Sequence, residues 1–135
     1  MTNILKRQTR EESKLLKKNH LFLKSKKLID SIFENGKYFK EYPLSVRFLQ
    51  VNEVNDINFV ISVKKKYLPK AVDRNKIKRL MRNSLRECVE ELKNKISEKK
   101  KSYHIAIIYN SSIIYDIDYL KDKINLILTR LIVNE

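Results

Sequence analysis

The feature that most constrains the fold is a strongly basic stretch, residues 64–86, that also has the apolar spacing of a helix. It contains ten lysines and arginines and one acid, Asp73. From Asp73 onward, apolar or small residues recur every three or four positions, which predicts an amphipathic helix packed on a core. These residues are Ile77, Met81, Ser84, Leu85, Cys88 and Leu92. We expect Asp73 to be the N-cap and the helix to end near Ile96.

An adjoining face of the same predicted helix is cationic. Cations in the first turns oppose the helix dipole, so a helix shaped only by its own stability would carry acids there. Solvated charged helices usually interleave acids at four-residue spacing, but here acids return only at Glu87, beyond the cluster. The pattern is typical of nucleic-acid binding. The predicted binding residues are Lys64, Lys65, Lys66, Arg74, Asn75, Lys76, Lys78, Arg79, Arg82 and Arg86.

The positive charge is concentrated in two segments. The 135 residues have a net charge of +14, of which residues 1–27 carry +7 and residues 64–86 carry +9, leaving −2 elsewhere. Such patches indicate a phosphate-bearing partner and not merely a soluble protein. We expect residues 1–20 to form a flexible basic N-terminal tail and residues 21–135 to form a single domain.

Several other classes of protein are disfavoured. Cys88 is the only cysteine, which excludes a disulfide framework and favours a reducing, cytoplasmic compartment. No apolar run approaches the ~20 residues of a membrane span, so no membrane partner is expected. Gly36 is the only glycine, which excludes the glycine-rich loops that cradle phosphates.

The sequence offers no clear catalytic or metal site. His20, His104 and Cys88 fall on different predicted elements, so they do not form a zinc site. Asp116 and Asp118 are spaced suitably for a two-metal nuclease, but acids at a helix start are more often there for capping. We therefore expect no catalytic residue and no metal ligand, and we interpret the protein as a binder.

The remaining pattern predicts an α+β fold, an α/β sandwich with helices packed on a small mixed sheet. A first helix begins at Lys24 or Ser25 and ends at Gly36 in a left-handed cap. Alternating apolar residues predict strands at 44–49 and 57–63, paired as an antiparallel hairpin. Residues 99–101 form a loop, a further strand covers 103–109, and a final helix begins at Asp116. The expected order is helix, strands, helix, strand and helix.

The run Ala71–Arg82, with the strand end Ile61–Lys65 before it, resembles the protein component of bacterial ribonuclease P. In that family an Arg-Asn-Arg run opens a basic helix after a strand ending in Ser-Val and lysines. Lys76 stands here where the second arginine is usual. Residues 29–36 resemble the first helix of the family with its glycine stop, and the similarity covers about residues 21–132.

The resemblance implies more than the residue pattern does. It implies a left-handed crossover between parallel strands, and a catalytic RNA subunit that hydrolyses the phosphodiester with its own magnesium ions. The protein would be the non-catalytic subunit of this endoribonuclease and would dock on that RNA through the basic helix. It would bind the 5′ leader of precursor tRNA, and not DNA, in a cleft between the first helix and the sheet. The cleft residues would be Ile29, Phe33 and Arg47, with Arg47 replacing an aromatic residue.

Two questions stay open at the level of sequence. The apolar spacing favours Phe33 as a core aromatic, whereas the resemblance favours an open position that stacks on a base. The same charge pattern also fits a non-catalytic RNA chaperone or a ribosome-associated protein. A helix-turn-helix DNA regulator is disfavoured, because the basic helix follows a strand and has no short partner helix.

Overall fold

The structure, a computed structural model, describes residues 21–51, 57–99 and 102–133. The elements form in the predicted order of helix, strands, helix, strand and helix. The tail expected over residues 1–20 lies outside the described residues. The elements are α2 (Lys26–Asn35), β1 (Lys37–Glu41), β2 (Leu44–Val51), β3 (Ile57–Val63), α3 (Ala71–Lys99), β4 (Ser102–Tyr109) and α4 (Ile117–Val133).

The four strands form one mixed sheet in the order β1-β2-β4-β3. Strand β2 is antiparallel to both β1 and β4, whereas β3 runs parallel to β4. The predicted hairpin between the strands at 44–49 and 57–63 is therefore wrong, because β4 lies between them. All eight residues of β4 are buried, and a fully buried apolar strand requires neighbours on both edges and cover on both faces.

Strand β1 was not predicted, and it supplies the real hairpin partner of β2. Its sequence, KYFKE, leaves most of its side chains exposed or half-buried, so the apolar alternation that marks a half-buried strand is weak. β1 forms an edge of the sheet. Its short length and the exposed lysines Lys37 and Lys40 disfavour pairing with the edge of another chain.

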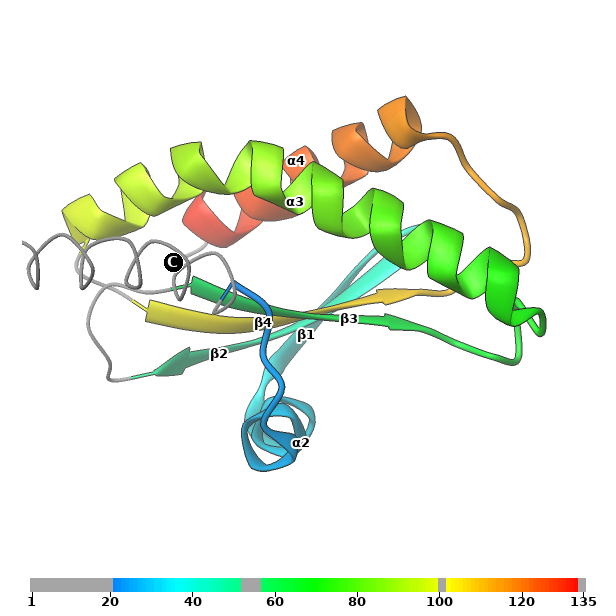
Figure 1. The fold of residues 1–135 in the computed structure, drawn as a ribbon. Coiled ribbons are helices and arrows are strands. Elements are labelled where there is room, and N and C mark those ends of the chain that lie inside the picture. Colours follow the sequence, from blue (N-terminus) through cyan, green and yellow to red (C-terminus); the bar gives the residue numbers. More distant parts are fainter. Residues whose placement is uncertain (1–20, 52–56, 100–101, 134–135) are drawn as a thin grey trace, which may run out of the picture.

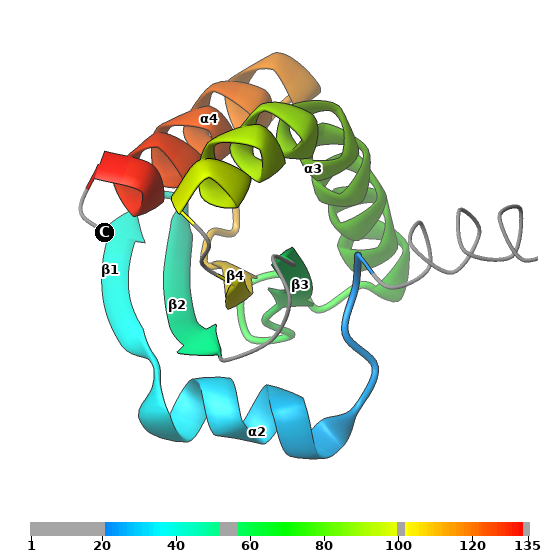
Figure 2. The same ribbon diagram turned by 90° about the vertical axis from the view of Figure 1, so that its left-hand side faces the viewer.

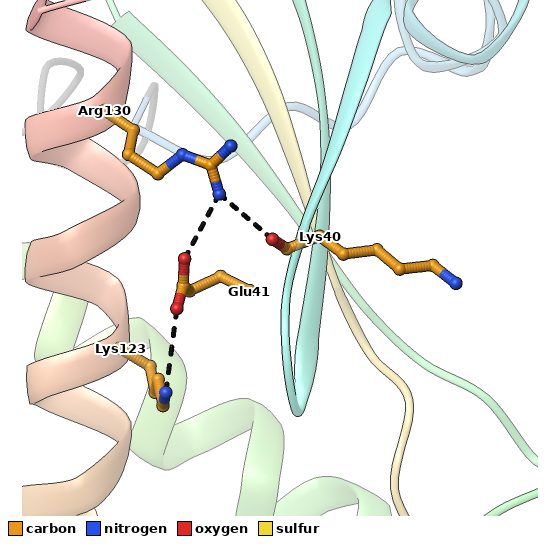
Figure 3. A network of polar contacts seen from close by, with 4 residues as sticks. All are labelled: Lys40, Glu41, Lys123 and Arg130. Carbon is orange, nitrogen blue, oxygen red and sulfur yellow. Dashed lines mark hydrogen bonds and ion pairs between the residues drawn. The ribbon is translucent and has the colours of Figure 1, made fainter.

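A polar network ties helix α4 to β1 (Figure 3). Arg130 donates hydrogen bonds to the Lys40 carbonyl oxygen at 3.0 Å and to the Glu41 carboxylate at 3.2 Å. Its guanidinium carbon also lies 4.2 Å from the centre of the Phe39 ring. Lys123 lies 3.7 Å from the other carboxylate oxygen of Glu41. An exposed ion pair contributes only about 0–1 kcal/mol, but the combination of contacts fixes the position of α4 over the edge strand.

The connection from β3 through α3 to β4 is left-handed. In Figure 2 the parallel strands β3 and β4 run away from the viewer, and the chain passes anticlockwise from β3, over the sheet in α3, to β4. About 98% of such crossovers in proteins are right-handed. The handedness implied by the family resemblance is thus confirmed, and no sequence pattern alone would have predicted it.

The sheet is the middle of three layers, with α3 and α4 on one face and α2 on the other (Figure 2). Alternate residues of the strands point to α3 and α4 and form the main core with both helices. The core residues on the central strand are Tyr103, Ile105, Ile107 and Tyr109. On the opposite face, Ile32 of α2 is fully buried, as is Ala106 of β4. The smaller α2 layer leaves part of this face exposed.

Helix α2 begins as predicted but ends differently. The Ser25 hydroxyl accepts a hydrogen bond from the Leu28 amide at 3.5 Å, which confirms Ser25 as the N-cap. Gly36 has φ −76° and ψ 152°, so the predicted left-handed cap is wrong. The chain instead enters β1 directly in an extended conformation. Glycine is required for space, because a Cβ atom would lie 2.4 Å from the Ile32 carbonyl oxygen and 3.1 Å from that of Phe48.

The N-cap predicted for α3 is wrong, whereas the one predicted for α4 is confirmed. Helix α3 begins at Ala71, and the Arg74 amide already donates to the Lys70 carbonyl at 3.2 Å. Asp73 is therefore a first-turn acid that favours the helix dipole, not the predicted N-cap. At α4, the Asp116 carboxylate accepts a hydrogen bond from the Tyr119 amide at 2.9 Å, which confirms the capping interpretation of Asp116.

Candidate nucleic-acid interface

The inner face of α3 anchors the helix to the core. Ile77, Met81, Ser84 and Leu85 are buried and Cys88 is half-buried, as the apolar spacing predicted. The buried Ser84 hydroxyl donates to the Leu80 carbonyl at 2.8 Å, so this polar group is satisfied within the helix. The side chain of Leu92 lies outside the described residues. Because this stripe faces the sheet, the cationic residues of α3 must face away from it.

The outer side of α3 and the turn before it carry the predicted binding residues together, nine cations and Asn75. Within the described part of the chain, no carboxylate forms an ion pair with any of them. Lys78 and Arg74 are half-buried and the others are exposed. We call this set the basic surface: Lys64, Lys65, Lys66, Arg74, Asn75, Lys76, Lys78, Arg79, Arg82 and Arg86. Its charges are therefore available to a polyanion.

Arg74 differs from the other members because its guanidinium is already engaged. One of its nitrogens donates to the carbonyl oxygens of Leu68 at 2.9 Å and Pro69 at 2.6 Å. On the other side of the turn, the Lys64 carbonyl accepts from the amides of Tyr67 and Leu68 at 3.1 and 3.2 Å. Arg74 thus fixes the turn that presents the three lysines, a role that the sequence pattern did not indicate.

Phe22 lies beside the basic surface, and the sequence pattern did not indicate it. Its ring centre lies 5.9 Å from the guanidinium carbon of Arg82 and 5.3 Å from that of Arg86, within the range of cation–π attraction. Phe22 is held by the β3 edge, where the Leu23 amide donates to the Phe59 carbonyl at 2.8 Å. Phe22 therefore packs against Arg82 and Arg86 and helps to fix their positions on the basic surface.

A second surface lies on the α2 face of the sheet. Phe33 and Tyr38 are 38% and 48% exposed, so the interpretation of Phe33 as a core aromatic is wrong. The Arg47 guanidinium carbon lies 5.9 Å from the centre of the Phe33 ring and 5.1 Å from that of Tyr38. Arg47 also reaches the Phe33 carbonyl at 3.5 Å. We call Ile29, Phe33, Tyr38 and Arg47 the α2 surface.

The structure brings the three predicted cleft residues together and adds Tyr38 to them. Ile29 is half-buried and lies one helical turn before Phe33. Tyr38 is paired directly with Arg47 across β1 and β2, so the two side chains lie on the same face of the sheet. Tyr38 could have been identified from its pairing with Arg47 across β1 and β2. This pairing could not be inferred from the sequence, because β1 itself was not predicted.

Neither surface contains an evident catalytic group. Among residues 21–51, 57–99 and 102–133, no group of three or more His, Cys, Asp or Glu side chains is placed to hold a metal ion. Within the same residues, no helix is both long and apolar enough to cross a membrane. The geometry offers a group of cations on α3 and the turn before it, suited to phosphates, and one cation beside two exposed rings on the α2 face, suited to bases.

Comparison with known proteins assigns the family. Residues 15–131 match the family model Ribonuclease P. The chain belongs to the ribonuclease P protein family. The ribonuclease P protein component of Porphyromonas gingivalis is 34% identical over 91 residues, which cover 66% of this chain and 64% of that protein. This chain therefore spans somewhat less than two thirds of that curated ribonuclease P relative.

Solved ribonuclease P proteins share the fold. The Staphylococcus aureus ribonuclease P protein superposes with a TM-score of 0.65 at 20% identity, covering 82% of this chain and 94% of that one. The Thermotoga maritima protein gives a TM-score of 0.63 at 23% identity, covering 80% and 94%. The predicted α+β fold is thus confirmed, as is the resemblance first seen in the basic helix.

Proposed function

We propose that this ribonuclease P family member is the protein subunit of a ribonucleoprotein endoribonuclease that removes the 5′ leader of precursor tRNA. The observation that carries the proposal is the basic surface, whose cations are left without carboxylate partners among the described residues, along a helix that is firmly packed on the core. Membership of the ribonuclease P family supports cleavage of precursor tRNA as the reaction. The protein binds RNA, and the catalytic RNA subunit performs the hydrolysis.

The two surfaces divide the binding between two RNA molecules. The basic surface lies on α3 and the turn before it, and it binds the phosphate backbone of the RNA subunit. The α2 surface lies on the opposite face of the sheet (Figure 2). There, Phe33 and Tyr38 offer ring faces and Arg47 a cation, a combination suited to the single-stranded leader. A protein with a polyanion on each side can hold the leader against the catalytic RNA.

The remaining parts of the proposal follow from this division. The magnesium ions are held by the RNA subunit, and the protein lowers the magnesium requirement by neutralising phosphates near the site of assembly. We do not expect duplex DNA as a ligand, because the exposed rings of Phe33 and Tyr38 suit the unstacked bases of a single strand. With a single cysteine in the chain, a reducing cytoplasm suits the protein.

Cleavage of precursor tRNA at low magnesium tests the proposal. We expect little cleavage by the cognate RNA subunit alone, strong stimulation on adding the protein, and no cleavage by the protein alone. Robust magnesium-dependent cleavage by RNA-free protein, abolished by Asp116→Asn, would contradict it and indicate a protein nuclease. RNA binding without stimulation of cleavage would instead identify an RNA chaperone.

Changes in the α2 surface should affect only the recognition of the leader. We expect Phe33→Leu and Arg47→Ala each to weaken binding of precursor tRNA to the assembled enzyme, since a stacked base contributes about 1–3 kcal/mol. Mature tRNA, which has no leader, should bind as before, and Phe33→Tyr should retain the leader contact. Competition binding with both tRNA forms measures this difference.

The same variants also distinguish a surface role from a structural one. Truncation of a core phenylalanine costs about 3–5 kcal/mol of stability, whereas variants of the exposed Phe33 should melt near the temperature of the unchanged protein. Equal losses for precursor and mature tRNA, or a collapse of the melting temperature, would refute the assignment of this surface to the leader.

A further inference from the structure

One exposed apolar surface belongs to neither the basic surface nor the α2 surface. Tyr42 in the β1–β2 turn is 58% exposed, and Ile113 and Ile114 in the β4–α4 loop are 57% and 43% exposed. We call these three residues the end surface, because they lie at one end of the sheet. Large apolar side chains gathered on a surface commonly mark a site of interaction.

The loop that carries the two isoleucines is held by its own hydrogen bonds. The buried Tyr109 hydroxyl donates to the Ile113 carbonyl and accepts from the Tyr115 amide at 3.3 Å. Burial raises the pKa of Tyr109, which keeps this hydroxyl protonated as a donor. Ser111 accepts from the Ile113 amide at 3.0 Å. The loop is thus shaped by backbone and hydroxyl groups, and the exposed isoleucine side chains are not needed for its conformation.

The Tyr42 turn is fastened to the same loop. The backbone amide of Asn110 donates to the Pro43 carbonyl at 2.9 Å, and its side-chain amide donates to the Ser45 hydroxyl at 2.7 Å. The Tyr42 hydroxyl lies 3.2 Å from that of Ser111. The Tyr42 ring meets Tyr115 edge to face at 6.5 Å. One edge of the ring is therefore supported while more than half of the side chain stays open, so the surface is preorganised.

The end surface adjoins the lysine turn of the basic surface. Val63, Tyr109 and Leu44 are paired side by side at the ends of β3, β4 and β2. The lysine turn, the β4–α4 loop and the Tyr42 turn all continue from these positions, and Figure 1 shows the loop after β4 and the start of α3 at the same end of the sheet.

The charges at this end favour an anionic partner. Lys64, Lys65 and Lys66 are exposed in the turn. Four acids lie at this end. Asp116 caps α4, and Asp118 and Asp73 lie in the first turns of α4 and α3, where the helix dipole offsets part of their charge. Glu41, next to Tyr42, is already paired with Lys123 and Arg130.

We propose that the end surface is a contact with the RNA subunit, at which an unstacked nucleotide packs on Tyr42 and on the two isoleucines. This inference rests on the proposed function and extends the basic surface beyond the phosphate contacts. Folded RNAs present splayed bases that proteins bind on aromatic and apolar side chains. Cations next to such side chains serve the phosphates of the same strand, which favours RNA over an apolar protein partner.

The variants Ile113→Ser/Ile114→Ser and Tyr42→Leu test the proposal, with the full-length protein and its cognate RNA subunit. Stacking on one base corresponds to roughly 5- to 150-fold in affinity, and we expect a loss in this range. The salt dependence of binding should keep its slope, because no charge is removed. Tyr42→Phe, which keeps the ring, should bind as the unchanged protein does. Leu126→Ser on α4, at a 49% exposed leucine, is the matched control and should have no effect.

The outcomes separate this inference from the proposed function. If the double isoleucine variant binds with unchanged affinity while Arg79→Ala/Arg82→Ala weakens binding, the end surface is not an RNA contact and the proposed function stands. If the unchanged protein fails to bind the RNA subunit, the proposed function itself fails. If the unchanged protein self-associates and the double isoleucine variant does not, the surface joins two copies and the proposal is overturned.

Discussion

Replacing Arg79 and Arg82 together by alanine should weaken binding of the RNA subunit by about 10- to 100-fold. Both side chains are exposed on α3 and have no carboxylate partner among the described residues. Removing one cation that neutralises a phosphate reduces the slope of log affinity against log salt by about 0.7–0.9, so we expect a decrease of about 1.4–1.8 for the pair. Titrations at several salt concentrations measure both quantities. An unchanged slope would show that this is only a solvated helix face.

Two comparisons identify the cause of the weaker binding. Lys121→Ala/Lys123→Ala removes the same charge from α4, where these lysines already pair with Glu87 and Glu41, and should leave the slope nearly unchanged. Arg74→Lys keeps its charge but loses the planar group that donates to two carbonyls of the lysine turn. It should weaken binding without changing the slope, unlike the variants at Arg79 and Arg82.

Substitution of Gly36 by alanine should have the largest effect on stability. The added Cβ would lie 2.4 Å from the Ile32 carbonyl oxygen and 3.1 Å from that of Phe48. Both are backbone atoms, so α2 or β2 must shift to relieve the overlap. Overpacking of this kind typically costs about 1–3 kcal/mol. Denaturant unfolding gives the value directly.

The neighbouring substitution Asn35→Ala is the control for Gly36. Asn35 is exposed at the last position of α2, and exposed substitutions usually change stability by less than about 0.5 kcal/mol. Because α2 carries Phe33, its displacement in Gly36→Ala should also reduce the preference for precursor over mature tRNA. A Gly36→Ala protein as stable as the unchanged one would show that the backbone yields here at no cost.

Features with a strong local signal were predictable from the sequence. The burial of Ile77, Met81 and Leu85 followed from the helical spacing, and Asp116 was correctly interpreted as a cap. Asp73 was misplaced because the local rule for an N-cap does not account for the preceding turn. There, the Lys70 carbonyl already accepts the first helical hydrogen bond.

Features that depend on contacts between distant segments were not predictable. The partner of β3 is separated from it by the whole of α3, so a hairpin with the adjacent strand β2 was the simpler but wrong expectation. Ile32 and Phe33 are adjacent apolar residues of one helix. The sheet buries Ile32 and leaves Phe33 exposed, a choice that depends on the orientation of α2. Tyr38 joined the α2 surface only through its pairing with Arg47.

The central position of β4 has a consequence for synthesis of the chain. β1 and β2 are made first and pair with each other, and β3 follows, but β2 and β3 do not pair, and the strand that lies between them follows α3. A nascent chain that has not yet reached β4 therefore leaves unpaired the edges of β2 and β3 that β4 joins. Such intermediates are prone to aggregation and are the usual clients of chaperones. A fragment that ends within α3 cannot complete the four-stranded sheet, because it lacks the middle strand β4 that joins β2 to β3.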